Sequence, residues 1–351
     1  MKFGWRSALG IVLSAVLLYL AFKDIEFAKV IENIRRANLG LLILSAITAT
    51  LTFPLRARRW RPILDPVAPK VPFDALWRAT AIGMMLNNVA PARAGEPARA
   101  YALSRFTPRV SFPAAFASLA VDRLFDLVVI LVLMFGAMLD PAFPSGAKVF
   151  GFSMSSIAVK GLAFVSVALV GMYAMVLFPA RVLALYELVA RRIAPKLEEK
   201  GRVALVALMH GLSVLRSPSR FAAIFAWTLL HWLVNALAFW IGFKAVGIDA
   251  PYSSALFLQG VIAIGVAAPQ APGFFGVFEL FGKEGLRLYG VGADAAVTWA
   301  ISFHFLSFLP ITFIGGWYFL RAGLSMAQIG SVEKDATTDE PSTPAASPPR
   351  G

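Results

Sequence analysis

The sequence predicts an all-α, polytopic membrane protein with about six full transmembrane spans and two re-entrant broken hairpins in an inverted repeat. First, 58% of the 351 residues are hydrophobic and only 15% are charged, against roughly 45–50% and about 25% in soluble domains. Second, the apolar residues gather in runs long enough to cross a bilayer as helices. Third, two runs are interrupted by short segments rich in proline and glycine, which lipid tolerates only where protein or water covers the backbone.

The net charge of +13 comes from lysines and arginines in the connections between apolar runs, which indicates loops held on the cytoplasmic side. A nucleic-acid partner is not expected, because the chain has no soluble basic surface. There is no cysteine, which excludes disulfides and thiol chemistry. The three histidines lack a metal-ligand spacing and no Walker A sequence occurs, so we expect no metal, no cofactor and no ATPase activity.

The first half of the chain is predicted to contain three spans and the first broken hairpin. No cleavage site follows the N-terminal apolar run, which favours a retained span with its N-terminus inside. The second span ends in the basic segment Arg56 to Arg61, interpreted as a stop at the cytoplasmic face. The spans are expected at 8–22, 39–55 and 113–139, and the hairpin at 74–90 and 96–106.

The second half is predicted to start with a span and a basic connection, 181–220, that forms cytoplasmic or interfacial helices. Residues 326–351 are rich in Ser, Thr, Pro and Ala, which is typical of a disordered tail. This topology puts both termini in the cytoplasm of a multi-pass plasma (inner) membrane protein. The spans are expected at 156–178, 221–246 and 295–320, and the second hairpin at 253–268 and 274–289.

Segments 39–139 and 221–320 each read span, broken hairpin, span, within a transmembrane domain expected at 1–325. The breaks lie at Pro91 and Pro269, 178 residues apart. The basic connections give the two segments opposite orientations, so the repeat is inverted. Paired interruptions in inverted repeats are typical of transporters that bind substrate near the bilayer midplane. Any polytopic chain can be cut into similar pieces, but the matching composition of the breaks favours a true repeat.

The first break carries the strongest candidate for an anion-binding site. A helix that restarts near Gly95 presents unpaired backbone N–H groups with partial positive charge, and arginines flank this start. We predict that the segment binds a phosphate and that Glu96 pairs with Arg99 within one turn. The alternative is that the arginines are anchors at the headgroup level. The candidate residues are Asn87, Asn88, Arg93, Gly95, Glu96 and Arg99.

Three charged residues, Asp122, Arg123 and Asp126, lie within the span predicted at 113–139. Charges at membrane depth are unfavourable unless they are paired or hydrated, and they commonly mark function. Asp122 and Asp126 share a helix face, and Arg123 can pair with Asp126 three residues on. The three residues therefore either line a substrate or proton path or form a structural ion pair with the first hairpin.

The second break contains prolines and glycines, among them Gly273, but no arginine. Its second half-helix carries Glu279, Lys283 and Arg287 at four-residue spacing. This spacing predicts either an interfacial charge ladder or a Glu279 that faces a cavity opposite Glu96.

Two histidines lie within predicted spans. His231 is one turn from Asn235, and His304 is near the middle of the last span. Such residues are interhelical hydrogen bonders more often than proton carriers, and the sequence does not select a proton-coupling role.

The motifs around both breaks resemble those of a known family. Gly83 with Asn87 and Asn88, then Pro91-Ala92-Arg93-Ala94-Gly95-Glu96 and Arg99, look like the membrane domain of the lysylphosphatidylglycerol synthase family, also called flippase-like or UPF0104 proteins. The resemblance covers roughly residues 5–325. Its further motifs are Arg58-Arg59-Trp60 with Leu64, Asp122-Arg123-Leu124-Phe125-Asp126, and Pro272-Gly273-Phe274-Phe275-Gly276 with Glu279.

The resemblance implies a lipid translocase or an accessory of lipid-linked biosynthesis. In the synthases this domain precedes a soluble aminoacyltransferase, whereas this chain ends about 30 residues after the last predicted span, so we expect it not to be an enzyme. The expected partners are membrane lipids with an anionic headgroup, either phospholipids or polyprenyl-phosphate-linked lipids, together with a homo-oligomer or a lipid-biosynthesis enzyme. The rival functions are a membrane-embedded enzyme of lipid-linked glycan or glycolipid synthesis and an accessory protein without transport.

Overall fold

A computed structural model of the chain describes residues 5–66, 68–90, 94–144, 146, 148–149, 152–193, 198–199, 201–202, 205–206, 209, 216–266, 272–326 and 328. Its elements are helices apart from one short antiparallel ribbon, in which Lys148 pairs with Ser153 and Val149 with Phe152. The predicted all-α class is confirmed, and this ribbon is a small addition to it. The predicted tail at 326–351 lies outside the described residues except for two positions.

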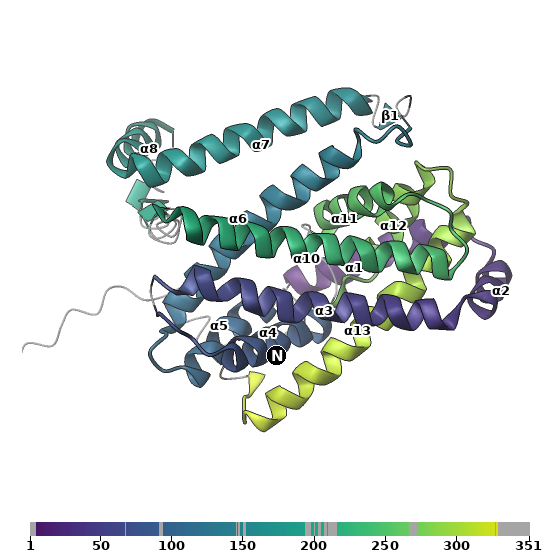
Figure 1. Cartoon of the computed structure of the whole chain (residues 1–351), viewed down its shortest axis with the longest axis horizontal. Coiled ribbons are helices and arrows are strands. Elements are labelled where there is room, and N and C mark those ends of the chain that lie inside the picture. The colour runs from purple at the N-terminus through teal and green to yellow at the C-terminus, as the bar shows by residue number, and fades with distance from the viewer. Residues whose placement is uncertain are drawn as a thin grey trace, which may run out of the picture.

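The helices follow the predicted order (Figure 1). The first half contains α1 (Trp5–Phe22), α2 (Phe27–Arg36), α3 (Leu39–Leu64), α4 (Phe73–Val89), α5 (Gly95–Phe106) and α6 (Phe112–Ala137). The second half contains β1 (Lys148–Val149), β2 (Phe152–Ser153), α7 (Met154–Leu177), α8 (Pro179–Ile193), α10 (Pro218–Ala245), α11 (Tyr252–Val266), η4 (Pro272–Phe274), α12 (Val277–Arg287) and α13 (Ala293–Arg321).

Three long helices begin at side chains that cap their first turn. Asn38 Oδ1 accepts the Leu41 N–H at 3.1 Å before α3, and Ser111 Oγ accepts the Ala114 N–H at 3.4 Å before α6. Ser153 does the same before α7. Such caps satisfy backbone donors that would otherwise be open at a helix start.

Four of the described helices are both long and apolar enough to cross a membrane: α3, α7 over Val159–Leu177, α10 and α13. The 26-residue α6 has the length of a span but carries three charged side chains, and α1 has 18 residues. The polytopic membrane fold is therefore confirmed, whereas the number of six full crossings stays a prediction.

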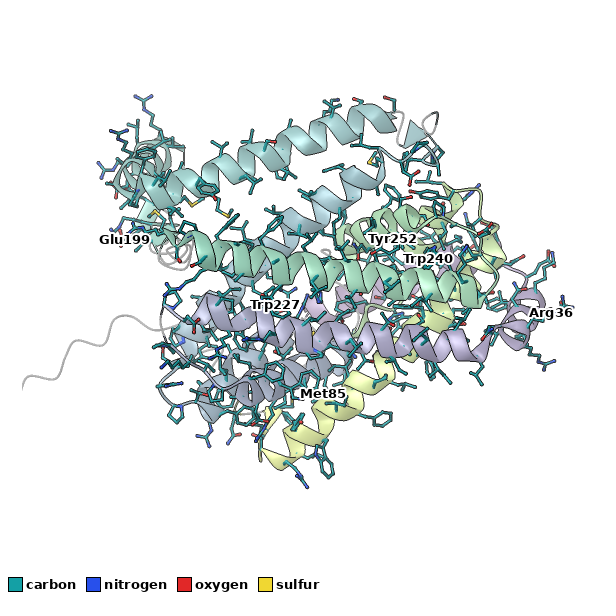
Figure 2. The ribbon with its side chains drawn as sticks, viewed as in Figure 1. Arg36, Met85, Glu199, Trp227, Trp240 and Tyr252 are labelled. Carbon is teal, nitrogen blue, oxygen red and sulfur yellow. The ribbon has the colours of Figure 1, made fainter. Side chains whose placement is uncertain are left out.

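The two long helices α3 and α10 pack against each other and run antiparallel (Figure 1). The Asn38 N–H, just before α3, donates to the Ala245 carbonyl at the end of α10 at 2.8 Å. Near the opposite end, the Arg58 guanidinium lies 5.7 Å from the centre of the Trp227 ring. Figure 2 shows Trp227 and Trp240 toward opposite ends of α10. The hairpin that follows α3 and the hairpin that follows α10 therefore start at opposite ends of the molecule.

Each broken hairpin returns to the end from which it starts. In the first, Arg109 Nη2, just after α5, donates to the Lys70 carbonyl, just before α4, at 2.7 Å. In the second, a Cβ on Gly285 of α12 would lie 2.3 Å from Leu258 Cδ1 of α11, so these half-helices also pack side by side. Since α3 and α10 are antiparallel, the two hairpins enter the fold from opposite ends.

The contacts between helices repeat when the two halves are exchanged. The contact of α4 with α13 has its counterpart in α11 with α6, that of α3 with α13 in α10 with α6, and that of α5 with α6 in α12 with α13. Together with antiparallel α3 and α10, this is the pattern of two repeats related by a twofold axis in the membrane plane. The structure agrees with the predicted inverted repeat, and its boundaries stay a prediction.

Candidate functional site

At the first break, the half-helices α4 and α5 are in contact through two glycines. A Cβ on Gly95 would lie 2.1 Å from the Gly83 carbonyl oxygen, so α4 and α5 approach backbone to backbone. The Gly95 N–H donates to Asn87 Oδ1 at 3.1 Å. One of the backbone N–H groups predicted to bind an anion therefore already has a hydrogen-bond acceptor within the hairpin. Arg93 lies outside the described residues.

Asn88 ties the tip of the first hairpin to α13. Its Nδ2 donates to Thr312 Oγ1 at 2.8 Å and to the Phe308 carbonyl at 3.4 Å. The last turn of α4, in the first repeat, is therefore held against the middle of α13, in the second repeat.

Two aspartates of α6 and one arginine of α3 form the centre of a buried charge cluster. Arg59 Nη2 pairs with Asp122 Oδ1 at 2.6 Å, and Arg59 Nη1 donates to Asp126 Oδ1 at 2.5 Å. The exposed fractions of the side chains are 0% for Arg59, 0% for Asp122 and 8% for Asp126. One guanidinium fork thus bridges two carboxylates that stand one turn apart on the same helix face.

The half-helix α5 adds a second ion pair from the first hairpin. Arg99 Nη1 donates to Asp122 Oδ2 at 3.3 Å, and its guanidinium lies 4.1 Å from the centre of the Trp60 ring. Glu96 pairs with Arg123 of α6. The predicted pairing of Glu96 with Arg99 is therefore wrong, because each finds a closer partner on α6.

Asp126 is shared by donors from three helices, α3, α6 and α10. Arg56 Nη2 lies 3.3 Å from Asp126 Oδ2, and this oxygen also accepts from Arg59 at 3.1 Å and from Arg123 at 3.4 Å. The Trp232 indole N–H of α10 donates to Asp126 Oδ1 at 2.9 Å. Among the described residues, the buried Nε of Arg56 has no hydrogen-bond partner.

The cluster carries more positive than negative charge. Four arginines against three carboxylates leave a net charge of +1. Buried charge of this kind is unfavourable unless partners or water compensate it, and it commonly marks function. The buried members are Arg56, Arg59, Arg99, Asp122 and Asp126, and the pair of Glu96 and Arg123 lies at the edge, with side chains 22% and 43% exposed.

The interpretation of Arg56 to Arg61 as a stop at the membrane surface is wrong for two of its members. The helix α3 continues to Leu64, and Arg56 and Arg59 are buried within the body. Their three-residue spacing places both on one helix face, as Asp122 and Asp126 are placed on α6. The arginines are three residues apart and the aspartates four, so each pair lies on one helix face, and these two faces of opposite charge are the sequence signal for their pairing.

At the second break, Glu279 and His304 link α12 to α13. His304 Nδ1 and Glu279 Oε1 lie 2.6 Å apart, and His304 Nε2 donates to the Gly273 carbonyl at 2.7 Å. The other carboxylate oxygen, Glu279 Oε2, accepts the Gly276 N–H at 2.7 Å. Glu279 is buried, which excludes an interfacial ladder at this residue, and a Glu279 that faces a cavity opposite Glu96 stays a prediction.

Lys283, the second residue of the predicted charge ladder, also lies away from the surface. Lys283 is buried, and its Nζ donates to the carbonyls of Leu20 and Ala21 at the end of α1, at 2.9 and 3.0 Å. Of the three residues only Arg287 is exposed, at 72%. Lys283 therefore holds α1 against α12 instead of facing lipid headgroups.

A cavity of about 230 Å³ lies where α3, α10 and α13 meet the inner ends of the two hairpins. The charge cluster reaches it through Arg56, the first hairpin through Asn88, and the second break through Phe274, Phe278 and His304. The polar side chains of its lining are those of Thr52, Arg56, Asn88, His231, Asn235, His304 and Ser307, beside the Trp232 ring. The cavity therefore brings both breaks to one space, in which several polar side chains lie among a mainly aromatic lining.

The predicted candidates lie in three places: this cavity, the charge cluster, and the contact between α4 and α5 that holds Asn87 and Gly95. Asn88 lines the cavity, and Glu279 and Gly273 border it through His304. The remaining described candidates lie outside its lining: Asn87, Gly95, Glu96, Arg99, Asp122, Arg123 and Asp126. The described residues contain no group of three His, Asp or Glu placed to hold a metal ion.

This geometry defines a class: a polytopic, all-helical membrane protein in which two broken hairpins of opposite orientation meet three long helices at a central cavity beside a charge cluster. The sequence model of the lysylphosphatidylglycerol synthase TM region matches residues 7–315. The chain belongs to this family of membrane domains, as its motifs indicate.

Three relatives extend this comparison. The chain is 35% identical to "Glycosyltransferase AglD" of Haloferax volcanii over 34% of this chain and 19% of that protein. It is 26% identical to "UPF0104 membrane protein PH1989" of Pyrococcus horikoshii over 37% of this chain and 38% of that protein. A "UPF0104 membrane protein" of Methanothermobacter thermautotrophicus is 23% identical over 86% of this chain and 89% of its own length. The matches to the first two thus span well under half of those proteins.

Proposed function

We propose that this protein binds the phosphate-bearing headgroup of an anionic lipid in its central cavity and moves that lipid between the two leaflets of the inner membrane. The observation that carries the proposal is Arg56, a guanidinium on the cavity wall that shares its carboxylate partner with two other arginines. Phospholipids and polyprenyl-phosphate-linked lipids both present phosphate oxygens that an arginine fork binds.

The size of the cavity suits a headgroup and leaves the lipid chains in the bilayer. Its volume of about 230 Å³ lies below the roughly 300–1,000 Å³ of sites that enclose a drug-sized ligand. A phosphate with its nearest substituent fits such a space, next to the amides of Asn88 and Asn235. The apolar chains stay in contact with the membrane, where they are already favourably solvated.

The orientation of the hairpins supports access from both faces. The first hairpin starts from the end of α3 and the second from the end of α10, and these helices are antiparallel. Movement of one hairpin at a time relative to the long helices opens the cavity to one face at a time, as in other transporters with inverted repeats.

The charge distribution supports cytoplasmic termini. The open end of the first hairpin and the end of α13 lie together, since Arg78 and Arg321 line one surface pocket with Phe106, and α3 ends only nine residues before this hairpin begins. This end carries many arginines, which is the pattern of a cytoplasmic face. Its arginines include Arg58, Arg61, Arg78, Arg105, Arg109 and Arg321.

Reconstitution into liposomes tests the proposal. Vesicles with trace phosphatidylglycerol that is fluorescently labelled on its headgroup are treated with an impermeant quencher, and the loss of the protected inner signal measures leaflet exchange. The wild-type protein should accelerate exchange above empty vesicles. Arg56→Gln should slow it about ten- to a hundredfold, the effect of one lost charge-assisted hydrogen bond. Arg56→Lys should fall between, because lysine keeps the charge and loses the fork.

The variant is expected to fold, since removing Arg56 brings the net charge of the cluster from +1 to zero. Arg78→Gln is the matched control, because Arg78 is a half-exposed arginine paired with Asp74 away from the cavity. The same assay with Arg93→Ala tests the predicted role of that residue. Absence of exchange for both labelled phosphatidylglycerol and a labelled polyprenyl phosphate contradicts the translocase proposal.

The relative named as a glycosyltransferase favours one alternative, a part in lipid-linked glycan or glycolipid synthesis, as an enzyme or an accessory protein. The alternative predicts that vesicles containing polyprenyl phosphate and a nucleotide sugar form lipid-linked sugar without leaflet exchange. The translocase proposal predicts exchange without sugar transfer. One reconstituted preparation assayed both ways separates the two.

A further inference from the structure

Two polar braces occupy matching places in the two halves of the fold. In the first half, Arg99 of α5 pairs with Asp122 of α6; in the second, Glu279 of α12 pairs with His304 of α13. Each brace joins the half-helix after a break to the long helix that follows. The sequence separations, 180 residues between Arg99 and Glu279 and 182 between Asp122 and His304, agree with the 178 between Pro91 and Pro269.

The braces differ in whether a proton can open them. An arginine stays charged throughout the physiological pH range, so the first brace is permanent. The second brace joins an imidazole nitrogen to a carboxylate oxygen, and this contact needs a proton between the two atoms. The sequence repeat has thus kept the position of the contact and changed its chemistry.

Counting hydrogen-bond donors shows that the second brace holds an extra proton. The Gly273 carbonyl can only accept, so His304 Nε2 must carry a hydrogen at its 2.7 Å contact. The opposite ring atom, Nδ1, lies 2.6 Å from a Glu279 oxygen. If Nδ1 and the carboxylate both lacked a proton, two lone pairs would face each other at this distance. The pair therefore contains one proton more than a neutral imidazole beside an ionised carboxylate.

The surroundings favour placing that proton on the histidine. Glu279 Oε2 accepts the Gly276 N–H at the start of α12, where the helix terminus stabilises a negative charge. The rings of Phe275 and Phe278 each lie 4.7 Å from the His304 ring, centre to centre, as suits a cation. These contacts favour an imidazolium paired with a carboxylate over a neutral imidazole beside a carboxylic acid.

The charged or titratable groups that face the pair are few. Arg56 of α3 and His231 of α10 line the same cavity, and Lys283 lies one turn further along α12, bonded to α1. The nearby parts of α1 and α11, residues 14–21 and 258–266, contain no charged side chain. Arg56 opposes a second positive charge in the cavity, so an anion bound there also favours the protonated brace.

The brace holds both ends of a strained turn. Gly273 and Gly276 have φ values of 70° and 89°, and Phe274 between them has φ of 63°. A left-handed conformation is unfavourable for phenylalanine and persists only where the surroundings hold it. His304 binds the Gly273 carbonyl and Glu279 binds the Gly276 amide, so the two partners clamp the turn from either side.

We propose that His304 and Glu279 form a proton-binding site that closes the second break over the cavity, and that loss of the proton releases the turn. The proton site goes beyond the translocase function and does not require it, because it rests on the hydrogen bonds of the brace alone. In a translocase it would make access from the side of the second hairpin depend on pH, while the first hairpin stays independent of it.

The protonation state is measured directly by 15N nuclear magnetic resonance of the full chain labelled at its histidines, in lipid bicelles between about pH 5 and 9, which brackets histidine titration. The chain has three histidines, and the resonances absent from His304→Gln belong to this residue. The expected result is an imidazolium, with both nitrogens protonated, that loses one proton as the pH rises. A neutral imidazole at His304 over the whole range overturns the proposal.

Closure of the turn is measured by reaction with an impermeant maleimide, since the chain has no cysteine of its own. Phe274→Cys reports on the cavity side of the turn. Asp249→Cys, at a position 98% exposed, corrects for the reagent's own pH dependence. The ratio of the two rates should rise about tenfold or more from low to high pH, which corresponds to one lost charge-assisted hydrogen bond.

With His304→Gln the ratio should be high and independent of pH. A ratio that is constant in the otherwise unchanged protein, or that rises equally in His304→Gln, overturns the proposed closure. Neither measurement uses lipid exchange, so failure of the proton site and failure of the translocase function give different results.

Discussion

Asp126→Asn should be among the most destabilising conservative substitutions in this protein. The asparagine keeps the shape of the side chain but removes a charge that Arg56, Arg59 and Arg123 share, at distances between 2.5 and 3.4 Å. The net charge of the buried cluster then rises from +1 to +2. One oxygen remains to accept the Trp232 N–H, so the loss is mainly electrostatic.

The magnitude follows from the burial of the cluster. At an effective dielectric constant of about 20, a carboxylate and a guanidinium about 4 Å apart attract by about 4 kcal/mol. The asparagine carbonyl replaces a part of this attraction. Removing one partner from a buried ion pair typically lowers the free energy of unfolding by about 3–5 kcal/mol, since the remaining charges are left uncompensated. We expect a value in this range.

The assay is unfolding in mixed micelles titrated with a denaturing detergent, followed by tryptophan fluorescence. Asp74→Asn is the matched control: Asp74 also pairs with an arginine, but its side chain is 59% exposed, and exposed pairs contribute under about 1 kcal/mol. If Asp126→Asn lowers the free energy of unfolding no more than Asp74→Asn does, the cluster is hydrated or compensated, and the reasoning from burial is refuted.

Two further predictions concern the first hairpin and the loop between α10 and α11. Gly95→Ala should lower the free energy of unfolding by about 1–3 kcal/mol, because the new Cβ meets the Gly83 carbonyl; Gly136→Ala, into open space, is the control, and equal effects contradict the close contact. The Lys244 side chain holds the pKa of the Asp249 carboxyl below its usual range through a hydrogen bond. The pair therefore stabilises the fold above the ordinary aspartate pKa and loses this effect as the pH falls through the lowered value. Lys244→Met should return the pKa of Asp249 to its usual range in a 13C titration, and an unchanged value refutes the pairing.

Much of the fold was predictable from local patterns. The long helices coincide with apolar runs, and the two breaks coincide with the proline- and glycine-rich interruptions. Two segments of the same order, span, broken hairpin and span, with breaks at Pro91 and Pro269, predicted a repeat. The contacts between the helices repeat in the same way. These features depend on hydropathy, helix length and chain order, which are properties of neighbouring residues.

The partners of the charged residues were not predictable in the same way. Glu96 and Arg99 stand three residues apart, yet each pairs with α6. Lys283 stands four residues from Glu279, yet it binds the end of α1. Ion pairs within one helix differ little in free energy, so the packing of neighbouring helices decides which charged residues pair.

Arg56 and Arg59 show where sequence and tertiary structure divide. The sequence determined that a basic segment ends an apolar helix, and this pattern fits equally a headgroup anchor and a buried ion pair. Only the packing of α6 against α3 brings Asp126 to Arg59 from 67 residues away and turns Arg56 toward the cavity. The physical reason is that an arginine at membrane depth is stable in two ways, by reaching water or by meeting a carboxylate. Which of the two occurs depends on a partner that is remote in the chain.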